Sequence, residues 1–454
     1  MPLPEKMGDI LKLADESLMK GTWKQHVDAA IDENVAGERN VKDSLLYSGI
    51  SARLPIKLHL LTMAESQYGK TFLETQMGAV LFPSIFEDIT EISPKAMYYE
   101  VQEKKNPRLY DGKIVMIDEL NDMSDMLRQF VKKATTNDRK KLSLKTVDDQ
   151  KYREMTIDGL PVVWTNTFEL VEDAGNQLHN RFFKVNLEDT DEQGDAVESM
   201  QQEQSTFGRR YDESPAVVAA RHIIKRIMDL DNPKPKRPLI LNPFGRHICE
   251  SKHGARNRRP MLDSLISAIA YANRFQRPQF EDDDMLLVLV SIADVNEGLA
   301  IYQANEEAQR TSAPEYLTRF LKLFEPGEWL TKVELSTRTG EKWGEALSAE
   351  VCYQYAHDLE EKNLLTSRRR TEYRYDFATE DKLPIEGRSF EYSPLSLDNS
   401  RIFILDSNFA NRELLATTVE QQIERSLVSN TNTRESDIEA IIGRLLTDTR
   451  QRDA

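Results

Sequence analysis

The chain has few of the residues that stabilise small secreted or zinc-bound proteins. Only two cysteines, Cys249 and Cys352, occur in its 454 residues. Two cysteines cannot complete a four-ligand zinc site by themselves, and they do not form the pattern of a disulfide framework. The sequence therefore predicts a fold stabilised by hydrophobic cores, and it is long enough for two or three domains.

Long apolar runs are also missing. No stretch reaches the ~18 apolar residues that are needed to cross a bilayer. The N-terminal segment has neither a basic start nor an unbroken apolar stretch, so we do not expect a secretory signal there. These features predict a cytoplasmic protein without a membrane partner, associated with the nucleoid if the source is prokaryotic.

Positive charge is outweighed by negative charge over the whole chain. The chain has 60 Lys and Arg residues and 76 Asp and Glu residues, which gives a net charge of −16 at pH 7. This balance argues against a generic nucleic-acid coat, because such a protein carries a broad positive field. A ring or clamp that presents positive charge locally remains possible, since basic clusters occur at 139–141, 234–237, 256–259 and 368–370.

Strand-like and helical segments alternate between residues 54 and 187, which is typical of an α/β domain with a mainly parallel sheet. The segments 56–64, 113–119 and 160–166 are apolar almost throughout, as expected of strands buried on both faces. Residues 181–187 are the next candidate strand. Residues 189–212 are acidic and rich in Gln, so we expect a linker or loop there.

Helical patterns follow the expected linker at 214–230, 260–274 and 284–309. Beyond residue 314 the sequence predicts a helix, a short segment, a longer helix from about 342 to 363, and a small hairpin within 364–379. Three helices and a hairpin are the pattern of a winged helix. The tail ends in an expected amphipathic helix at 436–446.

The segment from Ala64 to Thr71, AESQYGKT, follows a predicted buried strand and precedes a predicted helix. A phosphate-binding loop needs backbone N–H groups that face the phosphates, a lysine for their charge and a hydroxyl for Mg²⁺. Gly69, Lys70 and Thr71 supply its second half, and Ala64 replaces the first glycine. The nucleotide would also contact Ser66, Gln67 and Tyr68. Taken alone, the triplet also fits a lysine at an exposed helix start.

Two carboxylates support the nucleotide interpretation. The predicted strand IVMI ends in Asp118 and Glu119, about fifty residues after the loop. At the end of a parallel strand, Asp118 can hold Mg²⁺ together with Thr71, and Glu119 can activate the attacking water. The alternative is a strand that ends in solvent-facing acids, but it does not explain why both elements occur in this order. ATP and Mg²⁺ are therefore the expected cofactors.

Two further polar residues fit the same site. Asn166 ends a predicted buried strand, where it can hold the lytic water, although it could also merely cap a turn. Arg181 lies just before the next predicted strand. In ring ATPases an arginine at this point stabilises transition-state charge on a neighbouring subunit's nucleotide. A lone arginine is otherwise most often a surface residue.

With these residues, the chain resembles the AAA+ motor of the minichromosome maintenance (MCM) helicases, as a divergent member from a virus or mobile element. The segment 118–123, DELNDM, is similar to the family's Walker B signature, and Asn180-Arg181-Phe182 is similar to its Ser-Arg-Phe finger motif. The segment from Arg258 to Ile266 looks like its sensor-2 helix. The resemblance implies that Arg258 or Arg259 contacts nucleotide across a subunit boundary.

The resemblance covers about residues 50–380 and implies an α/β fold: an AAA+ P-loop ATPase core with a parallel sheet, a helical lid and a C-terminal winged-helix domain. The family's N-terminal oligonucleotide-binding barrel and zinc ribbon are not found in the sequence. The expected domains are an N-terminal helical extension at 1–50, the ATPase core at 51–190, a linker and helical lid at 191–312, the winged helix at 313–380 and a C-terminal extension at 381–454.

Two segments are candidates for DNA contact. Residues 141–147 and 152–157 alternate between apolar and polar around a polar turn, which predicts a β-hairpin that carries Lys145, Lys151 and Arg153. These cations can neutralise DNA phosphates without reading sequence, or they can simply keep a surface hairpin soluble. The winged-helix candidate adds Arg368, Arg369 and Arg370, although winged helices also dock proteins.

Three functions are consistent with these motifs. The first is an ATP-dependent DNA translocase or helicase that acts in replication as a homo-oligomeric ring, a hexamer, on single-stranded or forked DNA, with other replication proteins as possible partners. The second is a replication initiator or loader that binds DNA and ATP without unwinding. The third is an ATPase that remodels proteins, with a winged helix that binds a protein partner.

Overall fold

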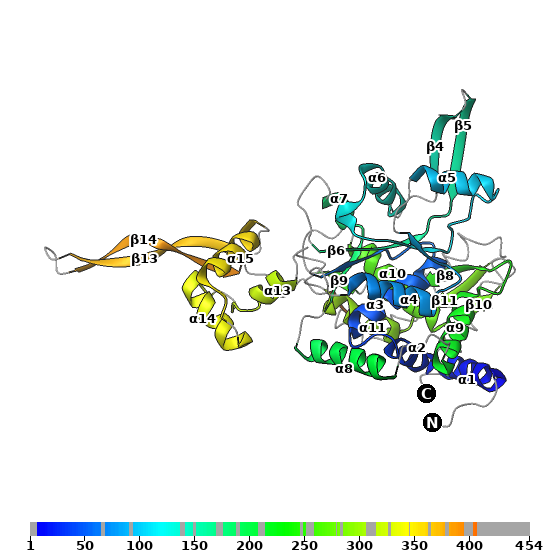
Figure 1. The fold of residues 1–454 in the computed structure, drawn as a ribbon, viewed down its shortest axis with the longest axis horizontal. Coiled ribbons are helices and arrows are strands. Elements are labelled where there is room, and N and C mark those ends of the chain that lie inside the picture. The colour runs from blue at the N-terminus through cyan, green and yellow to red at the C-terminus, as the bar shows by residue number, and fades with distance from the viewer. Residues whose placement is uncertain are drawn as a thin grey trace. The chain divides into compact units, whose positions relative to one another are not determined.

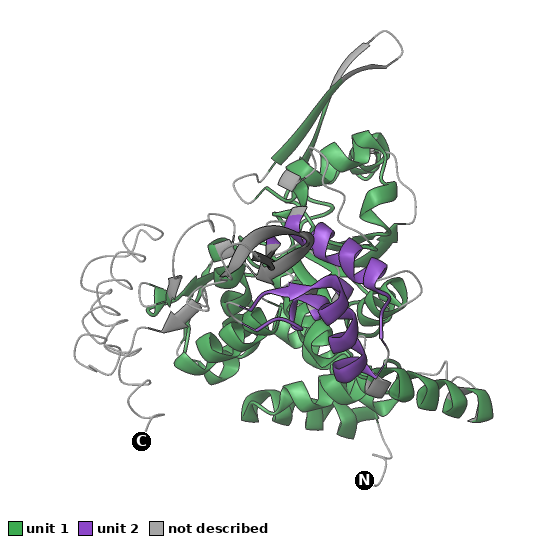
Figure 2. Ribbon diagram, turned by 90° about the vertical axis from the view of Figure 1, so that its left-hand side faces the viewer, with its two compact units in different colours: residues 1–305, 403–454 green, residues 306–402 purple. Residues whose placement is uncertain are grey.

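The computed structural model divides the chain into two compact units, residues 1–305 with 403–454 and residues 306–402 (Figure 2). We call them unit 1 and unit 2. The structure describes residues 7–64, 69–89, 94–136, 141–148, 151–168, 176–187, 191–207, 214–245, 248–250, 258–277, 279–281, 285–305, 315–325, 328–344, 346–361, 365–376, 381–394 and 403–405. The amphipathic helix expected at 436–446 lies outside these residues.

A parallel sheet forms the centre of unit 1, with the strand order β2-β3-β6-β1-β7 (Figure 1). Every residue of β1, β3 and β6 is buried, as the apolar runs predicted. Because β6 lies between β1 and β3, the carboxyl ends of these three strands are neighbours. The strands are β1 (Leu60–Met63), β2 (Phe86–Ile89), β3 (Ile114–Ile117), β6 (Val162–Thr167) and β7 (Phe183–Asn186).

Strand β2 was not predicted from the sequence. It is an edge strand of four residues, two of which are Glu87 and Asp88, and none of the four is fully buried. An edge strand has one unpaired side, so it can carry charged residues that a central strand excludes. Its first residue, Phe86, packs against the ring of Trp164 in β6 of the same sheet.

The N-terminal helices α1 (Met7–Lys20), α2 (Trp23–Asp32) and α3 (Arg39–Ile50) are part of the core of unit 1. The Trp164 indole in β6 is fully buried and donates a hydrogen bond of 2.8 Å to the hydroxyl of Ser48 in α3. The segment expected as an N-terminal extension therefore packs directly on the sheet. The other helices of this region are α4 (Lys70–Leu81), α5 (Pro94–Glu103), α6 (Asp125–Ala134) and α7 (Asn176–His179).

A β-hairpin projects from unit 1 between α6 and β6 (Figure 1). Its strands are β4 (Lys141–Asp148) and β5 (Lys151–Asp158), which pair in an antiparallel register as the sequence pattern predicted. Buried Leu142, Met155 and Ile157 anchor its base, and α5 packs beside β5. The hairpin thus stands on an apolar root in the core.

The second half of unit 1 corrects two expectations. Residues 189–212 contain the helix α8 (Asp191–Phe207) rather than a continuous loop. The helix predicted at 284–309 is a strand, β11 (Met285–Leu289), followed by α11 (Ile292–Ala304). The apolar run of β11 pairs in parallel with β8, and Ser291 begins α11 with a capping box to Asp294. A short apolar run alone does not distinguish a buried helix from a strand.

Unit 1 also contains two small sheets, with the strand orders β10-β11-β8 and β15-β9. The remaining elements of this unit are α9 (Pro215–Met228), β8 (Arg237–Leu241), β9 (Ile248–Glu250), α10 (Arg258–Ala272), β10 (Gln279–Glu281) and β15 (Phe403–Leu405). Apolar residues of α9, α10 and α11 belong to the same buried cluster as those of the central sheet. The helices expected as a lid therefore share a core with the central sheet.

Unit 2 contains three helices and an antiparallel sheet, β12-β14-β13, within its described residues. The hairpin expected within 364–379 is a single strand, β13, and its partner β14 comes from the segment expected as a C-terminal extension. The helix expected from about 342 begins at Ala349, because Gly344 in a left-handed conformation ends the preceding helix. The elements are α13 (Glu315–Leu321), β12 (Leu330–Thr331), α14 (Lys332–Trp343), α15 (Ala349–Glu361), β13 (Leu365–Asp376) and β14 (Asp381–Pro394).

Among the residues that the structure describes, no helix is long and apolar enough to cross a lipid bilayer. Within the same residues, no group of three His, Cys, Asp or Glu side chains is placed to hold a metal ion. A magnesium site in this part of the chain would therefore need other ligands, such as a hydroxyl and the phosphates of a nucleotide.

Candidate nucleotide site

The candidate nucleotide site begins at the carboxyl end of β1, where α4 starts with Lys70. Gly69 precedes the helix with φ +83°, and nothing lies within 4 Å of the position where a Cβ would stand. A side chain here would be strained by the backbone rather than by crowding, and glycine adopts this conformation freely. The N-terminal N–H groups of α4 and its dipole favour an anion at this point. Ser66, Gln67 and Tyr68 lie outside the described residues.

Lys70 is almost completely buried, and its Nζ donates a hydrogen bond of 2.7 Å to the carbonyl of Ala64. Burial lowers the pKa of this ammonium, whereas the charges of Glu119, Glu74 and Asp118 oppose that change. The lysine is therefore held close to the loop and to an acidic group of side chains. A phosphate chain at the start of α4 would lie within the field of this cation.

Asp118, Thr71 and Asn166 come together at the carboxyl ends of the strands, which we call the carboxyl edge of the sheet. The Thr71 hydroxyl donates a hydrogen bond of 2.9 Å to Asp118 Oδ1, and the Asn166 amide donates one of 2.9 Å to the same oxygen. The strand register explains this arrangement, because Asn166 pairs with Thr62 near the end of β1 and Asp118 directly follows β3. One carboxylate, one hydroxyl and one amide thus converge beside Lys70.

Glu119 has a backbone conformation that is uncommon for a residue with a side chain, with φ 38° and ψ 101°. Such conformations cost free energy and are concentrated at functional sites. Burial raises the pKa of the Glu119 carboxyl, and a hydrogen bond with Thr167 opposes that rise. A raised pKa brings a carboxylate closer to the range in which it can accept a proton from water.

Glu74 is a member of this group that was not predicted from the sequence. It is fully buried on α4, and its Oε2 accepts a hydrogen bond of 2.9 Å from the Asn166 amide. Burial raises the pKa of its carboxyl to about 7, although the Asn166 hydrogen bond favours the charged form. Lys70 and Glu74 are four residues apart, so they share one face of a helix, but that spacing alone is too common to identify a site.

Arg181 lies at the amino ends of the strands, which we call the amino edge of the sheet. It precedes β7, whose first residues pair with the beginning of β1. The four residues of these strands span roughly 13 Å, which separates Arg181 from the carboxyl edge and from Lys70. Its guanidinium donates hydrogen bonds to the carbonyl of Lys132 and the hydroxyl of Thr136 at the end of α6. Within one copy of the chain, Arg181 is therefore not part of the nucleotide site.

Arg259 is bound to neighbours within unit 1. Its Nε donates to the two carboxylate oxygens of Asp263 at 2.9 and 3.0 Å, and its Nη atoms donate to the carbonyls of Ile248 and Gly245 at 2.7 and 2.5 Å. A contact with a nucleotide would require some of these hydrogen bonds to be exchanged. Arg258 begins α10, and its side chain lies outside the described residues.

The candidate DNA-contacting residues lie on the two long hairpins. Lys145 is exposed on β4 and stands opposite Glu154 of β5. On β13 of unit 2, Arg368 and Arg369 are exposed, and the Arg368 guanidinium lies 3.9 Å from the centre of the Trp329 ring. Lys151, Arg153 and Arg370 belong to these strands, but their side chains lie outside the described residues.

Comparison with known protein families bears on the first half of the chain. Residues 11–229 match a family model described as the MTBMA_p00010 P-loop domain. This match supports a P-loop domain in the segment. It is an α/β domain whose central sheet is parallel, and a P-loop binds a nucleotide, typically together with Mg²⁺. The match begins in α1 and ends at the end of α9, so it extends beyond both ends of the segment 51–190 expected as the core. No curated protein matches the chain.

The buried carboxyl of Glu74 predicts a pH-dependent stability. Its pKa is above that of the unfolded chain, so between about pH 4.5 and pH 7 the folded chain keeps a proton that the unfolded chain loses. Raising the pH through this range should therefore destabilise the wild type relative to Glu74→Gln by about 3 kcal/mol. Urea unfolding of both proteins from pH 4 to pH 8, without nucleotide, measures the difference.

The exposed Glu203 of α8 provides the control, because the free energy of unfolding of Glu203→Gln should change with pH in the same way as that of the wild type. Parallel profiles for Glu74→Gln and the wild type would contradict the raised pKa.

Proposed function

We propose that this chain is an ATP-hydrolysing motor of the AAA+ type that acts on DNA as a ring of identical subunits, similar to the MCM helicases of replication. The convergence of Lys70, Thr71, Asp118 and Asn166 at one edge of the parallel sheet is the observation that carries this proposal. The matched P-loop domain supports the binding of a nucleotide, and the projecting hairpin supports the contact with DNA.

Each residue of the site has a role that follows from its position. The N–H groups at the start of α4 and the ammonium of Lys70 bind the phosphates, and Thr71 and Asp118 are the side chains that would hold Mg²⁺. The ion supplies positive charge that neutralises the phosphates during transfer. Glu119 accepts a proton from the attacking water, and Asn166 orients that water through its amide.

The hairpin β4–β5 is the candidate contact with the DNA backbone. It projects from the core, and Lys145 is exposed on it. Lys151 and Arg153 add positive charge to β5 in the sequence. Cations on such a projection bind phosphates of any sequence, which is what a motor that moves along a strand requires.

The position of Arg181 supports a ring in which neighbouring copies share each nucleotide site. An arginine at the amino edge of the sheet can reach a nucleotide only when another copy presents it. A heterologous interface that closes into a ring repeats this contact at every subunit. Arg258 or Arg259 would contribute to the same shared site, and a hexamer is the proposed assembly.

Unit 2 is proposed as the winged helix of this motor. The described elements of unit 2, three helices and a three-stranded antiparallel sheet with two long strands, have the composition of that fold. Arg368 and Arg369 are exposed on β13, and a second strand or a protein partner would meet them there.

Two substitutions test the nucleotide site. Lys70→Ala should lower ATP affinity by about a hundredfold or more, because the phosphates lose a buried cation. Glu119→Gln should keep ATP bound but lower kcat by roughly 10²- to 10⁴-fold, because the base is lost. Fluorescent-nucleotide binding and phosphate release measure both effects, and Lys104→Ala, at an exposed position directly after α5, is the control. ATP turnover at the wild-type rate in either variant would contradict the assigned roles.

A double charge reversal tests the hairpin. In Lys145→Glu with Lys151→Glu, ATP turnover should no longer respond to single-stranded DNA, because the hairpin would repel phosphates. The reversal of two lysines elsewhere, Lys20 and Lys104, is the control for net charge. Unchanged stimulation would exclude the hairpin as the DNA contact. Strand displacement on a forked duplex then separates a helicase from an initiator, which would bind and hydrolyse without unwinding.

A mixing experiment tests the shared site. Arg181→Ala and Lys70→Ala should each fail to hydrolyse ATP alone. The first variant lacks the arginine that acts on a neighbouring subunit's nucleotide, and the second lacks the lysine that binds the phosphates. A mixture of equal amounts should recover activity at about a quarter of the subunit interfaces, where an intact Arg181 meets an intact Lys70. Phosphate release from the mixture measures this recovery, and a mixture that stays inactive would contradict the contact between copies.

A further inference from the structure

A second concave site lies at the amino edge of the central sheet, away from Lys70. It is a cleft of about 780 Å³ within unit 1, a volume typical of sites for small molecules. The segment before β1, the loop after α5, the start of β6 and the segment before β8 form its walls. The position of His59 directly before β1 and of Leu160 before β6 fixes it at this edge.

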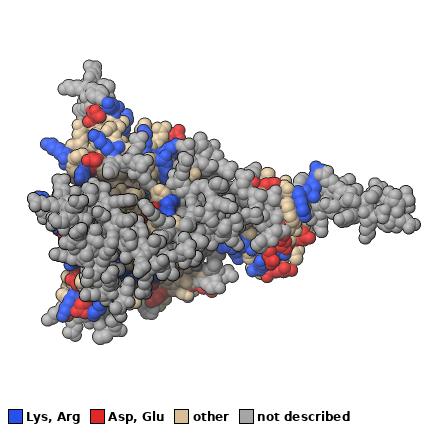
Figure 3. Space-filling model, turned by 180° about the vertical axis from the view of Figure 1, so that it is seen from behind, with Lys and Arg blue, Asp and Glu red and all other residues tan. Residues whose placement is uncertain are grey.

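The walls of the cleft are positively charged, although the chain as a whole carries −16. Five Lys or Arg residues and two Asp residues line it. Lys236 pairs with Glu281 at 2.8 Å, and Arg108 pairs with Asp111 at the rim. Figure 3 shows Lys and Arg side chains, together with some Asp and Glu, near the base of the hairpin.

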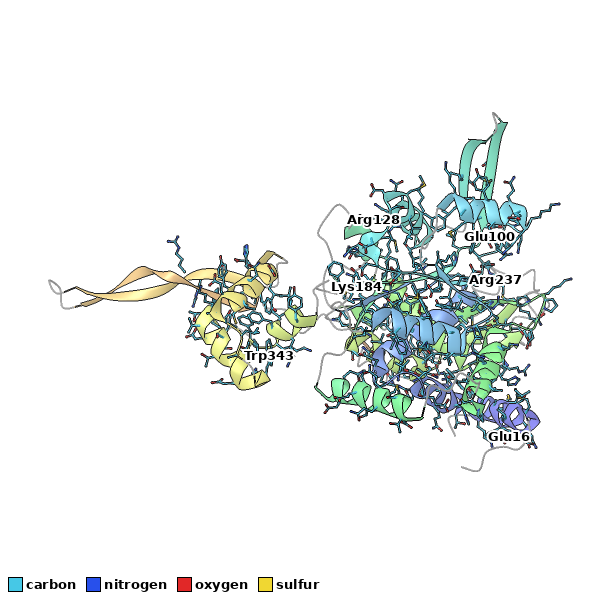
Figure 4. All side chains as sticks on the ribbon, viewed as in Figure 1. Glu16, Glu100, Arg128, Lys184, Arg237 and Trp343 are labelled. Carbon is cyan, nitrogen blue, oxygen red and sulfur yellow. The ribbon has the colours of Figure 1, made fainter. Side chains whose placement is uncertain are left out.

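Two arginines of the cleft retain unused binding capacity. Within the described residues, neither Arg53 nor Arg237 forms an ion pair. The Nε atom of Arg53 is buried, and no hydrogen-bond partner for it is found among those residues. A buried N–H without a partner costs free energy, so an anion that accepts from it would be favoured. Arg237 is exposed at the start of β8, on the same side of unit 1 as α5 (Figure 4).

Lys57 adds a cation that is largely buried in the wall. Its side chain is 14% exposed, its Nζ donates to the carbonyl of Ala52, and its nearest carboxylate oxygen, on Asp111, is 3.9 Å away. Burial lowers the pKa of Lys57 to about 8, which shows that its surroundings only partly compensate the charge. An anion in the cleft would supply the missing compensation.

His59 provides a neutral donor at the same place. Its Nδ1 accepts the N–H of Val163 at 3.1 Å, and burial lowers the pKa of the ring to about 3. The ring is therefore neutral at pH 7 and carries its proton on Nε2. Cationic side chains and a neutral imidazole thus line one hollow, an arrangement that suits a ligand with many oxygen acceptors.

We propose that this cleft binds a compact polyphosphate, such as inorganic tripolyphosphate or the phosphate chain of a nucleotide, as an anion site separate from the P-loop. Arg53 and Arg237 bind the phosphate oxygens, and Lys57 neutralises their charge from the wall. A nucleic-acid backbone fits the cleft less well, because a backbone needs a row of exposed cations, whereas the donors here lie inside a hollow.

The experiment uses the full-length chain with Lys70→Ala, so that the P-loop site no longer contributes. Isothermal titration with tripolyphosphate at constant ionic strength should show one site per chain. Arg53→Gln together with Arg237→Gln should weaken this binding by at least about tenfold, because two charge-assisted contacts are lost. Lys20→Gln with Lys104→Gln removes the same charge from exposed positions and should leave binding unchanged.

Two results would overturn the proposal. The first is no binding of tripolyphosphate to the Lys70→Ala protein, and the second is binding that the Arg53 and Arg237 substitutions leave unchanged. If the first result is accompanied by a loss of single-stranded DNA binding in the double variant, the cleft is assigned to a nucleic-acid backbone. None of these results depends on ATP hydrolysis, so they are distinct from a failure of the proposed motor function.

Discussion

The hydrogen bonds of the Asn166 amide are the interaction on which the candidate nucleotide site depends. This side chain joins Asp118, which follows β3, to Glu74, which lies on the helix after β1. Three elements that are far apart in the sequence are thereby fixed at one edge of the sheet. The parallel strand order makes this possible, because it places β6 between the other two strands and brings their carboxyl ends side by side.

The two edges of the central sheet have opposite chemical character. The carboxyl edge gathers three carboxyl groups around the buried Lys70, so a nucleotide bound there would need a cation beside its phosphates. The amino edge carries Arg181 and the basic cleft near Arg53. A chain with a net charge of −16 therefore separates its charges across one layer, so that an acidic edge of one copy and a basic edge of another are electrostatically complementary.

Much of the parallel sheet could be predicted from the sequence, because buried strands leave long apolar runs such as those of β1, β3 and β6. Strand β2 could not be predicted, because it is an outermost strand of the sheet and half of its residues are acidic. Helix α8 is mostly polar, so its sequence shows no apolar repeat that would predict a helix. The apolar run of β11 fits a helix as well as a strand. Glu74 was missed because only the folded chain shows that it meets Asn166.

The connection between the hairpin and the site is short. Strand β5 ends at Asp158 and β6 begins at Val162, so only Gly159, Leu160 and Pro161 separate the hairpin from the strand that carries Asn166. Leu160 is buried and proline restricts the backbone, which leaves little slack in this link. Mechanical load applied at the hairpin would therefore be transmitted along one continuous stretch of backbone to the amide that orients the site.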